Sequence, residues 1–182
     1  IQRIQQAKTD IKAAINDKGV TIPDNATIDT YPTYVSQISS GSGGSGDGDF
    51  IDMIERNIKS VIIPDGTTKI GSGAFAYCSK LTSVTIPESV TSIWSGAFQY
   101  CTALKEVTIP NSITSIQTWA FQHCSALTSI TILAATPPTL GTSVFDDTNN
   151  CPIYVPAASV SAYRAATNWT YYSSRIQAIP TE

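Results

Sequence analysis

A glycine-containing hexapeptide in the middle of the chain has the spacing of a dinucleotide-binding loop. Residues 71–76, Gly-Ser-Gly-Ala-Phe-Ala, match G-x-G-x-x-A and follow a strand-like run. A phosphate-binding loop of this kind needs a helix N-terminus behind it and an acidic residue about 20 positions further on. The equivalent segments 94–99 and 117–122 do not keep the glycine pair but retain Ala-Phe. We therefore interpret the hexapeptide as the turn of a repeat and predict no cofactor.

Four cysteines are the next candidates for chemistry. Cys78, Cys101 and Cys124 are separated by one constant interval, which would stack them in a column, whereas zinc sites gather paired ligands around one point. A stacking distance of about 4.8 Å is within reach of a disulfide. Buried free thiols acting as small apolar fillers are the favoured interpretation. Cys151 falls outside the column, in an irregular segment that leaves its exposure and redox state open.

The remaining titratable residues do not assemble into a catalytic set. His123 is the only histidine and has no acidic residue close to it in sequence, so no Ser-His-Asp arrangement is indicated. The carboxylates show no pairing suited to acid–base catalysis. Residues 146–150, Asp-Asp-Thr-Asn-Asn, carry oxygen ligands but lack the spacing and glycine of an EF-hand loop, and a polar insertion loop is the favoured interpretation. The sequence therefore predicts no enzyme activity and no metal site.

The composition indicates a scaffold. Of the 182 residues, 42% are apolar and only 14% charged, below the roughly 25% charged residues of ordinary soluble domains. A net charge of −3 argues against a nucleic-acid partner, which would select a clustered basic face. No apolar run approaches the roughly 18 residues of a membrane span. The length allows one core of about 100–150 residues and a smaller additional part.

A sequence repeat of constant length organises the second part of the chain. Three blocks, 58–80, 81–103 and 104–126, align without a gap and share the pattern L-x-x-V-x-I-P-x-x-V-x-x-I-x-x-x-A-F-x-x-C-x-x. A fourth, degenerate block covers 127–152, with Phe145 one position late. The columns that we expect in the core are Phe75, Phe98 and Phe121, and Cys78, Cys101 and Cys124.

Each block has the pattern of a strand followed by turns. Val84 and Ile86 alternate with polar residues, which predicts a strand with one buried face, and Pro87 ends it because proline cannot donate to a ladder. Phe98 and Cys101, three apart, are expected on one side of a single helical or 3₁₀ turn. One block has no second layer, so its apolar face is buried only when blocks stack into a solenoid.

Caps are expected at both ends of the repeats. Residues 50–57 have the apolar spacing of a short amphipathic N-terminal cap, and residues 153–182 are predicted to close the other end. In the C-terminal cap we expect a helix carrying Val160, Tyr163 and Ala166. An aromatic plug follows it, whose members are Trp169, Tyr171, Tyr172 and Ile176.

A leader precedes the repeats. Residues 1–38 are predicted to form two helices, the first with a heptad-like apolar seam, so the leader is expected to pair with copies of itself or with a missing neighbour. Residues 39–49 contain five of the eleven glycines and are predicted to be a flexible linker. The predicted domains are therefore a helical leader (1–38), a linker (39–49) and a repeat domain (50–182).

The repeat resembles the BspA-like class of leucine-rich repeat, L-x-x-I-x-I-P-x-x-V-x-x-I-G-x-x-A-F-x-x-C, over roughly Ile58 to Pro156. The resemblance implies a β-rich (α+β) solenoid with a C-terminal capping helix, found in surface proteins of host-associated bacteria and in proteins of gut phages. The sequence departs from the family pattern at Trp94 and Gln117, where the family has glycine, as at Gly71. We expect those turns to be shaped differently and Trp94 to project.

Two columns of side chains are candidates for binding. Tyr77, Tyr100 and His123 precede the three cysteines and predict either an aromatic strip for a sugar or peptide or a plain solvent-facing turn. Residues 58–133 contain 22 Ser or Thr and seven charges; a hydroxyl-rich sheet suits weak multivalent contact, although β-propensity alone also explains threonine. The predicted binding residues are Tyr77, Tyr100, His123, Trp94, Thr85, Thr108 and Thr131.

These features predict a non-catalytic recognition or adhesion module outside the cell or at its surface. Its partner is expected to be a protein or carbohydrate bound through the repeat face. The alternative is a phage tail or fibre component of the virion, in which residues 1–38 form a homo-oligomer and the repeats bind a receptor. An oligomeric leader would favour the fibre, and an export signal upstream in the gene would favour the bacterial adhesin.

Overall fold

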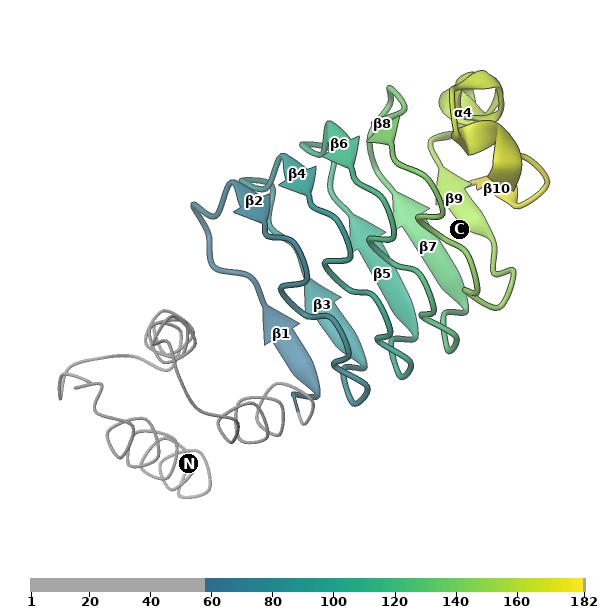
Figure 1. The fold of residues 1–182 in the computed structure, drawn as a ribbon. Coiled ribbons are helices and arrows are strands. Elements are labelled where there is room, and N and C mark those ends of the chain that lie inside the picture. The colour runs from purple at the N-terminus through teal and green to yellow at the C-terminus, as the bar shows by residue number, and fades with distance from the viewer. Residues whose placement is uncertain (1–57, 182) are drawn as a thin grey trace, which may run out of the picture. The chain divides into compact units, whose positions relative to one another are not determined.

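Stacked repeats with parallel strands form the part of the chain that the structure describes, residues 58–181 of a computed structural model (Figure 1). The leader and linker predicted over residues 1–49 and the N-terminal cap predicted over residues 50–57 lie outside the described residues. Oligomerisation through residues 1–38 therefore stays a prediction.

Each repeat contributes one longer strand and one very short strand, which form two rows. The longer strands are β1 (Ser60–Ile62), β3 (Ser83–Thr85), β5 (Glu106–Ile109), β7 (Ser129–Ile132) and β9 (Ile153–Val155), joined at the end by β10 (Ile176–Ala178). The short strands are β2 (Lys69–Ile70), β4 (Ser92–Ile93), β6 (Ser115–Ile116) and β8 (Thr139–Leu140). The sheets are β1-β3, β5-β7-β9-β10 and β2-β4-β6-β8, all with parallel pairing.

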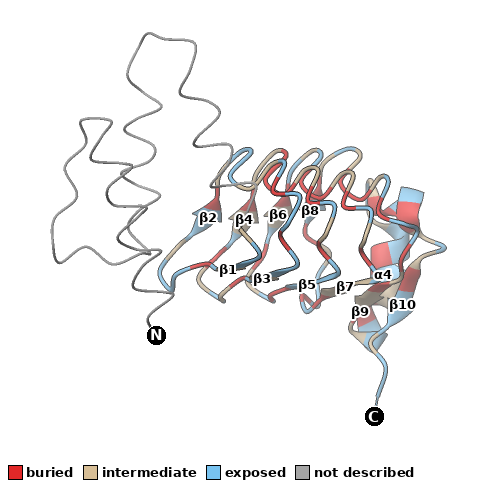
Figure 2. Cartoon of the chain, turned by 90° about the horizontal axis from the view of Figure 1, so that it is seen from below, coloured by how far each residue is buried: buried red, intermediate tan, exposed pale blue. Residues whose placement is uncertain are grey.

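The register between strands places equivalent positions of consecutive repeats side by side. Val107 lies opposite Ile130 and Ile93 lies opposite Ile116, which confirms the predicted stacking. Within β5, exposed Glu106 and Thr108 alternate with buried Val107 and Ile109, the alternation expected of a half-buried strand. Figure 2 shows this change between buried and exposed positions along strands and turns.

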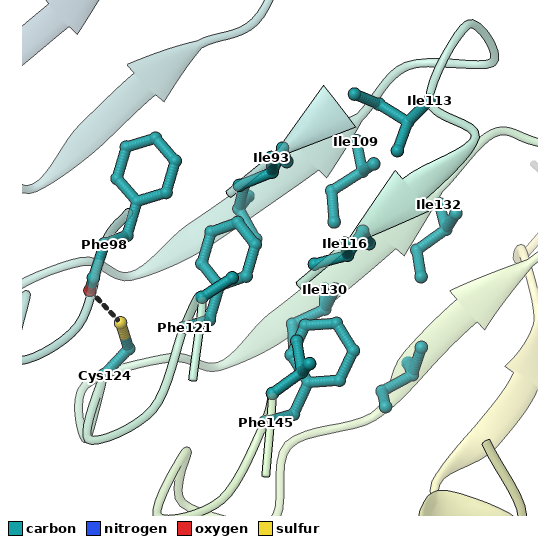
Figure 3. Close-up of a cluster of buried hydrophobic side chains, with 14 of the residues drawn as sticks. Ile93, Phe98, Ile109, Ile113, Ile116, Phe121, Cys124, Ile130, Ile132 and Phe145 are labelled. Carbon is teal, nitrogen blue, oxygen red and sulfur yellow. Dashed lines mark hydrogen bonds between the residues drawn. The ribbon is translucent and has the colours of Figure 1, made fainter. Parts of the chain in front are cut away.

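A ladder of phenylalanine rings runs along the core (Figure 3). Figure 3 shows the rings of Phe98, Phe121 and Phe145 in one row. Neighbouring ring centroids in the series Phe75, Phe98, Phe121 and Phe145 are 5.2, 5.1 and 5.8 Å apart. Phe98, Phe121 and Phe145 are completely buried, whereas Phe75 in the first described repeat is half-buried. The predicted phenylalanine column is therefore confirmed, and Phe145 extends it despite its late position in the sequence.

The cysteines of the column are buried and form no disulfide, as predicted. Their role goes beyond filling space, because two of them hydrogen-bond to the preceding repeat. Cys101 Sγ donates to the carbonyl oxygen of Phe75 and Cys124 Sγ to that of Phe98, both at 3.1 Å. A hydrogen bond with the Cys124 thiol and, after it, burial raise the pKa of Cys101, so this thiol stays protonated.

The expected helical or 3₁₀ turn around Phe98 is wrong; the segment is a series of tight turns. Its N–H groups alternate between two kinds of acceptor, one in the preceding turn of the same repeat and one in the next repeat. Ala97, Gln99 and Cys101 donate within the repeat, and Gly96, Phe98 and Tyr100 donate to the next one. Left-handed φ values of +63° at Gly96 and +62° at Tyr100 interrupt any helix.

A single inserted residue distinguishes the fourth repeat. Ile109 of β5 pairs with Ile132 of β7 at the regular repeat interval, whereas Ser115 of β6 pairs with Thr139 of β8, one position further on than that interval. The extra residue therefore lies in the loop 133–138. The insertion explains why Phe145 is late in the sequence but in register in space.

The insertion also corrects the prediction for residues 146–150 and decides the exposure of Cys151, which the sequence left open. Thr148 takes the place of the column cysteines and is 1% exposed, and Cys151 takes the place of the column leucines and is 4% exposed. The turn bond shows the equivalence: Cys151 N–H donates to the Thr148 carbonyl as Leu127 N–H does to Cys124. Residues 146–150 are thus part of a repeat rather than a polar insertion loop, and Cys151 is buried.

The C-terminal cap contains η2 (Ala157–Ser159), the helix α4 (Val160–Ala165) and η3 (Trp169–Tyr172), followed by β10. Its side chains donate to carbonyls of the fourth repeat that have no further repeat to pair with. Tyr163 Oη donates to Ala134 at 2.8 Å, Trp169 Nε1 to Pro138 at 2.9 Å and Asn168 Nδ2 to Leu140 at 2.7 Å. The cap thereby replaces the hydrogen bonds that a next repeat would make.

The predicted aromatic plug is confirmed for three of its four members. Trp169, Tyr172 and Ile176 are buried, as is Tyr163 of the helix. Tyr171 is the exception, because its side chain is 80% exposed. Within the short η3, Trp169 and Tyr172 stand at its two ends and share the inner side, which directs Tyr171 outward.

Gly141 should be the glycine most sensitive to substitution in the described repeats. A Cβ there would overlap the Thr118 backbone nitrogen and lie 2.7 Å from the Gln117 carbonyl carbon, whereas a Cβ at Gly71 meets nothing within 4 Å. We expect Gly141→Ala to destabilise the fold by about 1–3 kcal/mol and Gly71→Ala to change it by no more than about 0.5 kcal/mol. Thermal unfolding of both variants tests this, and equal melting temperatures would contradict the packing.

Thiol reactivity tests the corrected position of Cys151. All four cysteines are buried, and burial raises the pKa of the Cys151 thiol, so the native protein should show no fast reaction with Ellman's reagent. Unfolding in guanidinium chloride should release four reactive thiols. One fast native thiol that disappears in Cys151→Ala would show that this residue is exposed after all.

Candidate functional site

The predicted aromatic strip forms a continuous ring stack at the surface. Ring centroids of Tyr77 and Tyr100 are 4.8 Å apart, and those of Tyr100 and His123 are 4.4 Å apart. All three residues have a left-handed backbone, with φ of 64°, 62° and 60°, because the repeat turns at this point. Such a conformation costs on the order of 1 kcal/mol or more for a residue with a side chain, which ring stacking worth about 0.5–1.5 kcal/mol per pair offsets.

The stacking limits what the strip can bind. Tyr100 is covered on one face by Tyr77 and on the other by His123, so its ring faces are not available to a sugar. The strip instead presents ring edges, phenol oxygens and an imidazole, which suits hydrogen bonding. Tyr77 at the end of the stack is 52% exposed.

An acidic partner for the histidine lies one repeat further on. His123 Nδ1 is 3.1 Å from Asp147 Oδ2, and Asp147 has the same left-handed backbone, with φ of 55°. This pair was not predicted from the sequence, because more than a whole repeat separates the two residues along the chain. The register of the fourth repeat, once the insertion is included, is the signal that places Asp147 at the end of the strip.

The predicted threonine column is also brought together. Thr85 is opposite Ile62, and Thr108 is opposite Thr131 on the outward side of the long strands. The series continues beyond the prediction, because Thr131 pairs with Tyr154 and Tyr154 with Gln177. Ile62, at the first strand, is 78% exposed.

Trp94 does not belong with either column. It follows β4 in the other row of strands, half-buried, with its Nε1 donating to Ser92 Oγ at 3.2 Å and Lys69 Nζ 4.6 Å from its ring. The prediction that the turn at Trp94 has a different shape is wrong. Gly71 does not have a positive φ, and the backbone N–H three positions later donates to the carbonyl of Gly71 and to that of Trp94 alike. The left-handed glycines of these two turns are Gly73 and Gly96, each two positions later.

Trp119 is a surface residue that the sequence argument overlooked. It occupies the position of Gly73 and Gly96 with a φ of 61°, and its side chain is 48% exposed. This position is glycine in the first two repeats and tryptophan in the third. That difference is visible in the sequence and could have identified Trp119.

Both predicted columns end at one open cavity of about 850 Å³, formed between the fourth repeat and the C-terminal cap. Asp147 continues the aromatic strip into its wall, and Tyr154 continues the threonine column. The complete lining is Phe145, Asp146, Asp147, Asn150, Pro152, Tyr154, Tyr171, Tyr172, Ser174, Arg175 and Gln177.

Arg175 holds the floor of this cavity together. Its Nε donates to the Cys151 carbonyl at 2.9 Å, Nη1 to the Phe145 carbonyl at 3.1 Å and Nη2 to Thr148 Oγ1 at 2.7 Å. The guanidinium fork therefore ties the cap to the last repeat. Its donors are directed into the protein rather than toward a ligand.

A phenol and a carboxylate complete the wall. Tyr172 Oη donates to Asp146 Oδ1 at 2.8 Å and accepts from the Phe145 N–H at 3.2 Å. Burial raises the pKa of Tyr172 to about 12, so the phenol remains protonated and keeps the Asp146 carboxylate in place. Among residues 58–181 no cluster of three or more His, Cys, Asp or Glu side chains is arranged to hold a metal ion.

The parallel strands of the stacked repeats and the single short α-helix of the described C-terminal segment define a leucine-rich-repeat fold. The model of the BspA type leucine rich repeat region, which comprises six copies, matches residues 53–167. The chain belongs to this family, as the repeat motif predicted. Within the described residues, no helix has the length and apolar character needed to cross a membrane.

Two solved structures are similar to parts of this chain. A leucine-rich repeat protein from Bacteroides ovatus ATCC 8483 is 25% identical with a TM-score of 0.52, over 68% of this chain and 30% of that one. A leucine rich cell surface protein from Faecalibacterium prausnitzii A2-165 is 29% identical with a TM-score of 0.42, over 57% of this chain and 37% of that one. The chain thus spans about a third of the length of these proteins. No curated protein matches it.

Replacing Arg175 should loosen the junction between the cap and the last repeat. Arg175→Gln removes four hydrogen bonds to partly buried acceptors, three to oxygen atoms and one to Cys151 Sγ, so we expect a loss of about 2–3 kcal/mol in the free energy of unfolding. Arg164→Gln is the matched control, because exposed Arg164 makes one such bond, to the Ile176 carbonyl, and should lose less than about 1 kcal/mol. Urea unfolding distinguishes the two, and equal losses would contradict the structural role of Arg175.

Proposed function

We propose that this chain is a non-catalytic recognition module. Its repeats form a solenoid displayed at a cell surface, and they bind a protein or carbohydrate partner through the face that carries the threonine column and the aromatic strip. The observation that carries the proposal is the convergence of these two columns on one cavity. Membership of the BspA-type leucine-rich-repeat family supports a role in surface recognition.

The chemistry of the face suits hydrogen-bonded contact. Thr85 and Thr108 are exposed and Thr131 is half-exposed, and residues 58–133 hold only seven charged side chains against 22 Ser or Thr. Neighbouring strands lie about 4.8 Å apart, so the face offers the same hydroxyl at a regular interval. A partner with repeating polar groups matches this spacing.

The size of the face limits the affinity of a single contact. A standard interface buries about 800 Å² on each partner, and this face is only a few strands wide, with few large side chains at its centre. We propose that copies act together, since linked weak contacts can raise the apparent affinity by about 10²–10⁴. Homo-oligomerisation through residues 1–38 would supply those copies, and light scattering of the full chain beside a chain starting at Phe50 measures it.

A charge placed in the middle of the face tests the proposal. The probes are immobilised mucins and extracellular-matrix glycoproteins, with binding of the full chain followed by biolayer interferometry. Thr108→Lys should weaken binding about tenfold or more, because it puts a long charged side chain into the centre of the contact. Thr114→Lys is the control, as Thr114 is an exposed threonine beside β6 in the other row of strands. Equal binding by the two variants would contradict recognition through the threonine face.

A further inference from the structure

We propose that the cavity between the fourth repeat and the C-terminal cap is a binding site for a neutral carbohydrate, with Tyr171 as the ring on which the sugar packs. The inference rests on the proposed recognition function and names a ligand class and a site for it. At about 850 Å³, the cavity is within the range of about 300–1,000 Å³ that is usual for small-ligand sites.

The aromatic component comes from the cap. Tyr171 lies on the cavity wall with 80% of its side chain exposed, although its neighbours in η3, Trp169 and Tyr172, are buried. Tyr154 adds a second, half-buried ring from β9. The C–H face of a pyranose packs on an exposed aromatic ring, and a tyrosine provides that apolar surface together with a polar tip. Tyr100 in the aromatic strip cannot serve in this way, because both its faces are covered.

The polar component is held in place before any ligand arrives. Asp146 is fixed by the Tyr172 phenol at 2.8 Å and Asp147 by His123 at 3.1 Å. Exposed amide and hydroxyl groups complete the set; they belong to Asn150, Ser174 and Gln177. Carboxylate oxygens accept hydrogen bonds from adjacent sugar hydroxyls, and amides both donate and accept. Fixed acceptors lower the entropic cost of binding.

The charge of the cavity favours a neutral ligand. Its lining has two carboxylates and one guanidinium, and the guanidinium donates to Cys151, Phe145 and Thr148 inside the protein. An acidic sugar would face the two carboxylates without a free cationic fork to bind it. A cationic peptide side chain would meet carboxylates that already have partners and the half-buried positive charge of Arg175 near them. A polyhydroxylated neutral ligand avoids both penalties.

NMR titration of the ¹⁵N-labelled full chain tests the site directly. The probes are maltotriose, mannotriose, chitotriose and N-acetyllactosamine, with sialyllactose as the acidic comparison and a lysine-rich peptide as the cationic one. At millimolar concentration, at least one neutral sugar should shift the amide resonances of Asn150, Tyr154, Ser174 and Gln177. Tyr171→Ala should weaken that binding about tenfold without unfolding the protein, since the side chain is largely exposed.

Trp119→Ala is the matched control, because Trp119 is also an exposed aromatic residue but does not line the cavity. It should leave sugar binding unchanged. The inference is overturned if no neutral sugar shifts the cavity resonances, if sialyllactose or the peptide binds there instead, or if Trp119→Ala rather than Tyr171→Ala abolishes binding. The proposed function fails separately, by equal binding of the Thr108→Lys and Thr114→Lys variants to the glycoprotein probes.

Discussion

The backbone hydrogen bonds between consecutive repeats are the interaction on which the rest of this structure depends. Alternate N–H groups of each turn donate to the next repeat, as from Phe98 to Ala120 at 2.8 Å and from Tyr100 to Gln122 at 2.9 Å. This ladder keeps equivalent positions one above the other. The core ring stack, the surface ring stack and the threonine column all follow from it, because each is one sequence position repeated at the spacing of the ladder.

The same ladder creates a problem at its end, since the last repeat presents carbonyls without a following repeat. The cap solves it with side chains: Tyr163, Asn168 and Trp169 donate to three of these carbonyls. Arg175 does the same for the turn that carries Phe145 and Cys151. Because the cap makes these hydrogen bonds with side chains, its backbone does not follow the path of a further repeat. The cavity lies between the fourth repeat and the cap. The proposed binding site thus lies where the periodic structure is terminated.

The turns explain why surface residues with specific chemistry gather where they do. Two equivalent positions take a left-handed backbone in all four repeats, and in the later repeats side-chain-bearing residues occupy both, among them Trp119, His123 and Asp147. Each such residue costs conformational energy. At His123 the cost is offset by stacking on Tyr100 and the contact with Asp147. At Trp119 no compensating contact accounts for the choice of tryptophan within the described residues.

The amino-acid sequence by itself determined the repeat, its strands, the buried columns of phenylalanine and cysteine, and the existence of a C-terminal cap. These properties follow from periodicity, since a face that one repeat cannot bury alone must stack on its copies. The tertiary structure alone decided the burial of Cys151, the His123–Asp147 pair and the cavity with exposed Tyr171. Each depends on the single insertion in the loop 133–138 or on contacts between the cap and residues more than one repeat away. Periodicity carries no information about such contacts, because they form only where the repeat is interrupted.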